Sequence, residues 1–540
     1  MTGQATRGRL IFMAAAIVSL AFLLRASPYL ASGVPYHTDT YPQLANARNL
    51  VASTPVSLSP AGGFDSYNIF WPADLLFFSV SSVVLGGPPV GVMPLLAPLV
   101  SSLMVVLFLA LLLTLGIDVR ASAVATLLFA VAGGSTMIST GVTKEGFAIP
   151  LMLLVLLLLN LWLLKGSRAS LWLSVPAFAV LLASHSLTSV VGLLLSAYLG
   201  AAYLLLPGPA RKRAGAVLLV TVLFSALSYL YFYVYAVSNL PYLLQPSDVV
   251  SLFAYEALFT LPVWLGGALR LRTHDWAALW LGLAALGVSG LFASALAFHA
   301  LLDSPLVSPY LLFLVLPYLV VSFLAAAGIR VSGGDGRGPV FASLWALGLL
   351  GIVAFTIFGT PGAVGTSLRI ADFVYPGVAI LGAIALSSLM GAGRVRTWAA
   401  VGAVGALVLG SVLVVPYTAL WSGPAGGSQR LYSPADIAAL GWVARLPANQ
   451  AVYGDARASY LASYYLPGKA IDVGGGFVYL AGVQGLGKGC LLVSGLVSQI
   501  GYIGPTYGLP VNMTLVGGLP SNPSLRVTYS DGLDRAFCSA

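Results

Sequence analysis

The sequence predicts a polytopic α-helical membrane protein with a small α/β domain at its C-terminal end. Hydrophobic residues make up 59% of the 540 residues, charged residues only 8%, and the mean hydropathy is +0.95. Soluble chains are about a quarter charged, so this chain has too little charge to cover a soluble globule. Its apolar runs are continuous and approach twenty residues, which predicts membrane helices and disfavours both disorder and a transmembrane barrel.

Thirteen apolar runs are predicted to span the membrane. They cover residues 10–25, 91–116, 121–140, 146–164, 170–185, 187–206, 214–236, 257–270, 275–298, 306–329, 339–358, 373–391 and 398–417. A further apolar stretch, 74–87, is short and ends in Gly-Gly-Pro-Pro, so it is either a fourteenth span or an interfacial helix. We interpret the first run as a retained span and not as a signal peptide, because no clear cleavage site follows it.

The basic residues orient these spans. With a cytoplasmic N-terminus and no crossing by 74–87, 14 Lys and Arg residues lie in inside loops and 4 lie in outside loops or span ends. The alternative would place three basic loops outside, against the bias of membrane proteins toward cytoplasmic positive charge. The net charge of +9 is therefore explained by topology, and no nucleic-acid partner is expected. The predicted location is the cell membrane, with an outside C-terminus.

This topology divides the chain into two predicted domains. Residues 1–417 form the membrane domain, whose long first outer loop covers 26–90, and residues 418–540 form an extracytoplasmic domain. In the second domain, Ser433 and the Pro-Ala-Asp that follows it have the pattern of a helix start. The segment AVYGDARASYLASYY has a strand-turn-helix pattern, so an α/β arrangement is expected.

The first candidate site residue is Asp39, in the segment YHTDTYPQLANAR directly after the first span. On the outer side this carboxylate lies near the lipid headgroups, where it can take the proton of an acceptor hydroxyl while a lipid phosphate departs from a sugar. Asp before an amphipathic run is also a common helix N-cap, and on spacing alone the cap is favoured. His37 and Tyr41 flank Asp39 and are candidate substrate-binding residues.

The second outer loop contains Lys144 and Glu145, in the segment TKEGFAIP. Glu145 is a candidate second catalytic acid. Together with Asp39 it is a candidate ligand pair for a divalent cation such as Mg or Mn, which prefer oxygen ligands. Lys144 is a candidate phosphate binder. The alternative, favoured by the local sequence, is a Lys-Glu pair that marks a span end and extends toward water.

Two more candidates lie at span ends on the outer side. Arg369 enters a late span against the positive-inside pattern, and a guanidinium can hold a phosphate with two parallel donors. A salt bridge to Asp372 or anchoring at the interface is an equal alternative. His185, between the fifth and sixth spans, is a candidate donor to a phosphate or sugar oxygen, although such a histidine is more often a helix-end residue.

These segments resemble the GT-C superfamily of membrane glycosyltransferases, and most of all the oligosaccharyltransferase catalytic subunit family. HTDTYPQLANARNL is similar to the first-loop segment of that family, TKEGFAIPLMLL to its second-loop segment, and SLRIADFVYPGVAILGAIAL to a late span entered by an arginine. The resemblance covers the architecture of roughly residues 1–417. The chain lacks the family's Trp-Trp-Asp acceptor motif, because Trp421 and Trp442 stand in other contexts.

The resemblance implies a function. A sugar or glycan would be transferred, with inversion at the anomeric carbon, from a polyprenyl-phosphate (dolichyl-phosphate) donor to a glycan, lipid or protein acceptor at the outer face. In that function Asp39 would be the base or a metal ligand and Glu145 the second acid, while Arg369 and Lys144 would bind phosphate.

Two other functions stay open at this point. A transporter or flippase of a lipid-linked or small solute would need a cavity near the midplane, and the glycine-rich breaks at 132–135 and 265–267 are its only hints. A non-catalytic GT-C-like scaffold would bind a partner through its tail. The lack of a P-loop motif and the scarcity of charges inside the apolar runs favour chemistry at the outer face. The two cysteines, Cys490 and Cys538, leave a disulfide open.

Overall fold

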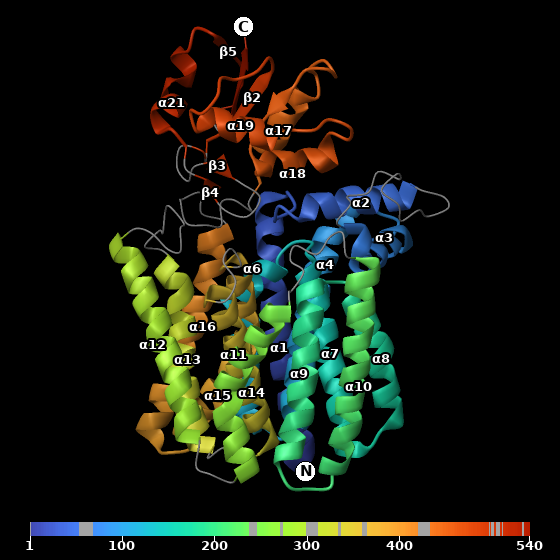
Figure 1. Cartoon of the computed structure of the whole chain (residues 1–540), viewed down its shortest axis with the longest axis vertical. Helices are drawn as coiled ribbons and strands as arrows, with labels where there is room; N and C mark the ends of the chain where they lie inside the picture. Colours follow the sequence, from blue (N-terminus) through green and yellow to red (C-terminus); the bar gives the residue numbers. More distant parts are fainter. Residues whose placement is uncertain are drawn as a thin grey trace.

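A bundle of long helices carries a small sheet-containing domain at one end in the computed structural model (Figure 1). The structure describes residues 2–52, 68–236, 246–269, 274–298, 311–332, 336–358, 364–419, 432–495, 497, 502–503, 508–509, 511–531 and 534–539. The N-terminus lies at the opposite end of the bundle from the C-terminal domain (Figure 1). We call the end of the bundle next to the C-terminal domain the domain end.

Short turns connect most helices of the bundle. In chain order the helices are α1 (Thr2–Ser32), α4 (Pro89–Thr114), α5 (Val119–Val131), α6 (Gly133–Ser139), α7 (Lys144–Lys165), α8 (Arg168–Leu182), α9 (Ser186–Leu205), α10 (Arg211–Leu230) with the π-helical turn η3 (Tyr231–Tyr235), α11 (Pro246–Leu269), α12 (His274–Phe298), α13 (Leu311–Ser332), α14 (Arg337–Phe358), α15 (Val364–Met390) and α16 (Arg394–Ala419). Every run predicted as a span overlaps these helices, and residues 306–310 of the run predicted at 306–329 lie outside the described residues. Among the described residues, 8 helices are long and apolar enough to cross a membrane, so the chain is a membrane protein. The count of thirteen spans stays a prediction.

The run predicted at 121–140 is two helices and not one. Ala132 separates α5 from α6, and the buried guanidinium of Arg25 on α1 fills the break. It donates hydrogen bonds to the carbonyl of Ala130 at 3.1 Å and to Ser139 Oγ at 2.8 Å. No water is present in a bilayer core to pair with backbone groups that a broken helix frees, so a buried donor at this place stabilises the break.

Charged side chains also lie further inside the helices than predicted. Because α11 begins at Pro246 and not near residue 257, Glu256 lies well within it and accepts a hydrogen bond from the hydroxyl of Tyr198. Arg25 and Asp372 likewise lie inside α1 and α15. The apolar runs themselves contain few charges, as the sequence indicates, but the helices extend beyond these runs and so include the three charged residues.

Two short helices lie between the bundle and the C-terminal domain (Figure 1). They are α2 (Thr40–Ala52) and α3 (Ala73–Val84), and the 3-10 turn η2 (Asn68–Phe70) precedes α3. A membrane span needs about 20 residues, and α3 has only 12. The interfacial interpretation of residues 74–87 therefore fits the structure better than a fourteenth span.

The C-terminal domain combines short helices with a four-stranded sheet. The elements are α17 (Pro434–Val443), β1 (Val452–Tyr453), α18 (Ala456–Tyr465), α19 (Val473–Leu480), β2 (Cys490–Ser494), β3 (Tyr502–Ile503), β4 (Gly508–Leu509), α21 (Met513–Gly518), η5 (Leu519–Ser521), β5 (Leu525–Ser530) and β6 (Asp534–Ser539). The sheet order is β1-β2-β6-β5, and β3 pairs with β4 separately. As predicted, Ser433 caps α17, and Asp436 completes a capping box with it.

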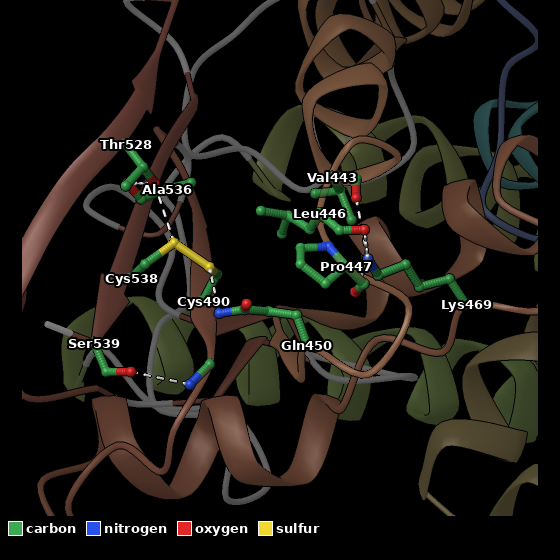
Figure 2. Close-up of a disulfide and its surroundings, with 11 residues drawn as sticks. Val443, Leu446, Pro447, Gln450, Lys469, Cys490, Thr528, Ala536, Cys538 and Ser539 are labelled. Carbon is green, nitrogen blue, oxygen red and sulfur yellow. Dashed lines mark hydrogen bonds between the residues drawn. A yellow bond between two sulfur atoms is a disulfide. The ribbon is translucent and has the colours of Figure 1, made fainter.

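A disulfide joins Cys490 on β2 to Cys538 on β6, where the two residues are paired across the antiparallel strands (Figure 2). The bridge closes a sequence separation of 48 residues, which includes most of the second half of the domain. The sulfur of Cys490 also accepts a hydrogen bond from the side chain of Gln450 at 3.6 Å. The pairing that the sequence left open is therefore formed.

The C-terminal domain shares a hydrophobic core with α2. The ring of Tyr41 packs edge-on against Tyr432, with centroids 4.7 Å apart, and Leu44 and Leu461 belong to the same buried cluster. The guanidinium of Arg48 donates to the carbonyl of Tyr464 at 2.6 Å. Because this core includes residues from both parts of the chain, it holds the domain against the first loop.

Candidate active site

All the predicted site residues lie in elements at the domain end of the bundle. His37 and Asp39 lie in the turn before α2, Tyr41 is in the first turn of α2, Lys144 and Glu145 begin α7, His185 precedes α9, and Arg369 lies in the second turn of α15. Helices that are far apart in sequence therefore bring these residues to one region.

The turn before α2 holds His37 and Asp39 together. His37 has a φ of +81°, a left-handed conformation that histidine adopts more often than most residues. Its Nδ1 accepts the backbone N–H of Asp39 at 3.2 Å and lies 3.7 Å from Asp39 Oδ2. The Asp39 side chain is 50% exposed, and no described backbone N–H of α2 donates to it. The predicted N-cap is therefore not formed, and the carboxylate is open to solvent.

One buried hydroxyl links the first loop to the second. Thr40 Oγ1 donates to the carbonyl of Tyr36 at 2.6 Å and accepts the backbone N–H of Val142 at 3.0 Å. Gly141 lies beside this contact with a φ of +87°, and a Cβ there would come within 2.4 Å of the Tyr36 carbonyl oxygen. The two loops are thus in backbone contact, and this contact places Asp39 near the start of α7.

Glu145 is the centre of the cluster. Its Oε1 lies 3.3 Å from Nε2 of His185 and 3.7 Å from Nη1 of Arg369. The Glu145 side chain is only 14% exposed, whereas that of Arg369 is 58% exposed. The alternative pairing of Arg369 with Asp372 does not account for this arrangement, because the guanidinium reaches Glu145 and Asp372 accepts a hydrogen bond from Tyr318. Arg369 therefore has free guanidinium surface for an anion.

The tautomer of His185 follows from its place as the N-cap of α9. Nδ1 accepts the backbone N–H of Thr188 at 3.3 Å, so in the neutral ring the proton lies on Nε2, which faces Glu145. Burial lowers the pKa of His185 below its ordinary value, against the opposing effect of the Glu145 charge. The charge of Asp39 acts on this ring as well. His185 is thus a neutral donor that orients Glu145 through Nε2. Through Nδ1 it also caps α9, which is the helix-end role considered from the sequence.

Lys144 is buried instead of extending toward water, with 5% of its surface exposed. Its charge acts on the carboxylate of Asp74, which is fully buried in the first turn of α3. Burial raises the pKa of Asp74 to about 6, and the positive charge of Lys144 opposes this shift. The prediction of an outward Lys-Glu pair is therefore wrong. Asp74 belongs to the same cluster, although the sequence analysis predicted no role for it.

Tyr41 is fully buried, and its hydroxyl donates to the carbonyl of Pro35 at 2.8 Å. Its ring also lies within 6.2 Å of the Tyr465 ring. These contacts assign Tyr41 to packing between α2 and the C-terminal domain. A substrate would have to displace this core to reach its ring.

A second polar cluster lines a cavity in the C-terminal domain. Arg457 Nη2 donates to Asp436 Oδ2 at 2.9 Å, and its guanidinium lies over the ring of Tyr432. Asp455 and Asp534 line the same cavity, and burial raises their pKa values to about 6 and about 7. Sequence reasoning did not identify this cluster. The Asp-Ala-Arg that opens α18 directly after β1 is the signal that would have found part of it.

The side chains of the cluster include groups that bind metal ions. Asp39, Glu145 and His185 supply the oxygen and nitrogen ligands that divalent cations take. Within the described ranges, however, no three His, Cys, Asp or Glu side chains are grouped so that they would hold a metal ion. Glu145 is instead engaged by His185 and Arg369. The arrangement therefore does not fit a bound cation.

Comparisons with known proteins bear on the fold. No protein-family model and no curated protein matches the sequence. Among solved structures, the oligosaccharyltransferase of Archaeoglobus fulgidus in its apo form matches with a TM-score of 0.57 and 13% identity, over 98% of this chain and 74% of that one. The same organism's AglB, in complex with an inhibitory peptide and a dolichol-phosphate, matches with a TM-score of 0.55 and 14% identity, over 99% and 74%. The chain described here therefore shares its fold with this archaeal oligosaccharyltransferase.

Proposed function

We propose that the protein is a membrane glycosyltransferase that moves a sugar or glycan from a polyprenyl-phosphate donor to an acceptor at the outer face. One observation carries the proposal. The exposed carboxylate of Asp39 lies at the same end of the bundle as the exposed guanidinium of Arg369, which is paired with the buried Glu145. A base for the acceptor and a cation for the leaving phosphate are the two groups that the reaction needs.

The comparisons support the substrate class. One oligosaccharyltransferase structure of the same fold contains a dolichol-phosphate, and another is tethered to an acceptor peptide with an NVT sequon. A third contains Zn, but the residues of this chain do not form a metal group in the described part. We therefore propose a polyprenyl-phosphate donor for this chain, and we do not propose a bound zinc ion.

The sidedness of the site has two independent supports. Cytoplasmic positive charge is the rule in membrane proteins, and the loops at the end opposite the C-terminal domain contain most of the bundle's Lys and Arg residues. The Cys490–Cys538 disulfide is typical of an oxidising, extracytoplasmic compartment. We therefore propose a multi-pass protein of the cell membrane with residues 1–417 as its membrane domain and residues 418–540 outside.

The proposed reaction is a single inverting displacement. The acceptor oxygen attacks the anomeric carbon, and Asp39 takes the acceptor's proton as the new bond forms. The bond from the anomeric carbon to the phosphate oxygen breaks, and the phosphate leaves with the electron pair. Arg369 offsets the negative charge on that phosphate with parallel N–H donors. Glu145, oriented by His185, holds the guanidinium in place.

The acceptor is proposed to approach from the C-terminal domain. The charge of Asp39 acts on Tyr432, which lines the cavity that also contains Asp455 and Arg457. An acceptor that is bound to this domain would therefore lie close to the base. The charged side chains that line the cavity favour a polar acceptor. Because the Trp-Trp-Asp motif is lacking, nothing in the cavity favours a peptide over a glycan or a lipid headgroup.

Donor turnover in membranes tests the proposal. The probes are dolichyl-phosphate mannose and dolichyl-phosphate glucose with radiolabelled sugars, and transfer to endogenous acceptors is counted. Asp39→Asn is expected to lower turnover by about a hundredfold or more, because the base is lost. Arg369→Ala is expected to lower it by about a hundredfold. A matched control is Asp275→Asn, which removes one charge from an exposed ion pair with Arg330 elsewhere in the bundle. Wild-type turnover by Asp39→Asn and Asp39→Ala would refute the catalytic assignment.

A further inference from the structure

A hydrogen-bonded chain within the bundle connects three helices just beneath the site. The hydroxyl of Tyr318 on α13 accepts the backbone N–H of Gly134 at 2.7 Å, in the first turn of α6. The same hydroxyl donates to Oδ1 of Asp372 on α15 at 3.3 Å. One phenol group therefore ties the start of α6 to α15.

The start of α6 fits against this chain only without a side chain. A Cβ at Gly134 would lie 1.9 Å from Asp372 Oδ1 and 2.6 Å from the Tyr318 hydroxyl. Both distances are far below van der Waals contact. The carboxylate of Asp372 is thus in direct contact with the backbone of α6, and the position of α15 relative to α6 is set by this contact.

Both ends of the Arg369–Glu145 pair depend on these two helices. Asp372 lies three residues after Arg369, one turn deeper along α15, so the two side chains lie on neighbouring parts of one helix face. α6 leads through a short turn into Glu145 at the start of α7, and Thr143 Oγ1 of that turn donates to the carbonyl of Ile138 at 2.7 Å. A shift of α15 against α6 would therefore change the distance between Arg369 and Glu145.

We propose that Tyr318 and Asp372 are positioning residues that hold Arg369 where it meets the donor phosphate. This inference rests on the proposed function, because it assumes that Arg369 binds that phosphate. Neither residue is among the groups proposed to take part in the reaction. Both residues act by holding α15 in position against α6, as their contacts with Gly134 indicate.

A double-mutant cycle in the full-length protein tests the inference. Tyr318→Phe removes the hydroxyl and keeps the ring, which packs against Tyr375. It is expected to lower kcat/KM for dolichyl-phosphate hexose by about tenfold, chiefly through a higher KM for the donor, because a small displacement of a binding group has a large effect. In the Arg369→Ala background the same change is expected to alter kcat/KM by less than about twofold, because the group being positioned is already absent.

Three further variants separate a positioning role of the Tyr318–Asp372 contact from a general loss of stability. Asp372→Asn keeps an oxygen acceptor and is expected to stay within about threefold of wild type, whereas Asp372→Leu should match Tyr318→Phe. Tyr198→Phe is the matched control, because it also removes a phenol hydroxyl that bonds a carboxylate inside the bundle, but on α9 and α11. Its effect should be equal in both backgrounds. Thermal unfolding of each variant separates positioning from loss of fold.

The experiment distinguishes a failure of the proposed function from a failure of the positioning inference. If Arg369→Ala has wild-type turnover, the phosphate role in the proposed function is refuted. If Arg369→Ala is impaired but Tyr318→Phe lowers kcat/KM equally in both backgrounds, or not at all, the positioning inference alone is overturned. If Tyr318→Phe does not fold, the pair Asp372→Asn and Asp372→Leu decides in the same way.

Discussion

Replacing Thr40 by valine should separate the two loops of the site while keeping the side-chain shape. Thr40 is fully buried, and its hydroxyl makes both hydrogen bonds that link Tyr36 to Val142. Loss of two such bonds, with a buried N–H left without its acceptor, corresponds to about 2–3 kcal/mol in the free energy of unfolding. We also expect transfer activity to fall at least about tenfold, because Asp39 is no longer held against the start of α7.

The assay is donor turnover in membranes, together with thermal unfolding of the purified protein in detergent. Thr40→Ser is the matched control, because it keeps the hydroxyl and removes only a methyl group, and it should retain most of the activity. The reasoning would be refuted by a Thr40→Val protein that turns over donor like wild type. It would equally be refuted if Thr40→Ser were as impaired as Thr40→Val, since the hydroxyl would then not be the cause.

Three further predictions concern the domain and the bundle. Because Asp455 and Asp534 keep their protons up to pKa values of about 6 and about 7, against 3.8 ordinarily, the folded domain binds more protons than the unfolded chain between about pH 4 and about pH 7. The domain's free energy of unfolding should therefore fall as the pH rises through this range. The shift of about two units at Asp455 alone corresponds to about 3 kcal/mol. Equal melting temperatures at pH 5 and pH 8 would contradict this prediction. Cys490→Ser removes a bridge over 48 residues, which corresponds to about 4 kcal/mol by loop entropy, and should make the domain sensitive to protease, whereas an unchanged digestion pattern would argue against it. Arg25→Met leaves the break between α5 and α6 without its buried donor and should lower the yield of folded protein in detergent, with partial recovery in Arg25→Lys; a normal yield from Arg25→Met would show that the arginine is dispensable there.

Local signals in the sequence predicted local structure where no distant partner intervenes. The Ser433 helix start was predicted correctly, because a cap and its acid lie within three residues of one another. The prediction that Asp39 caps α2 was wrong, because contacts with a part of the chain distant in sequence determine the conformation there. His37 adopts a left-handed conformation and turns the chain, while the hydroxyl of Thr40 bonds a loop about a hundred residues away. A pattern confined to a few residues contains no information about that second loop.

Apolar composition by itself determined that this chain is a helical membrane protein, because a bilayer accepts long runs of apolar residues only as helices whose backbone groups are paired internally. The limits of the apolar runs also placed Asp39, Glu145, His185 and Arg369 near helix ends. Only the tertiary structure decided which of these residues meet. The contacts of Glu145 with His185 and Arg369 join α7, α9 and α15, and the burial of Lys144 beside Asp74 joins α7 to α3. Such contacts depend on how whole helices pack against one another, and that packing is a sum of many weak side-chain contacts that no short segment contains.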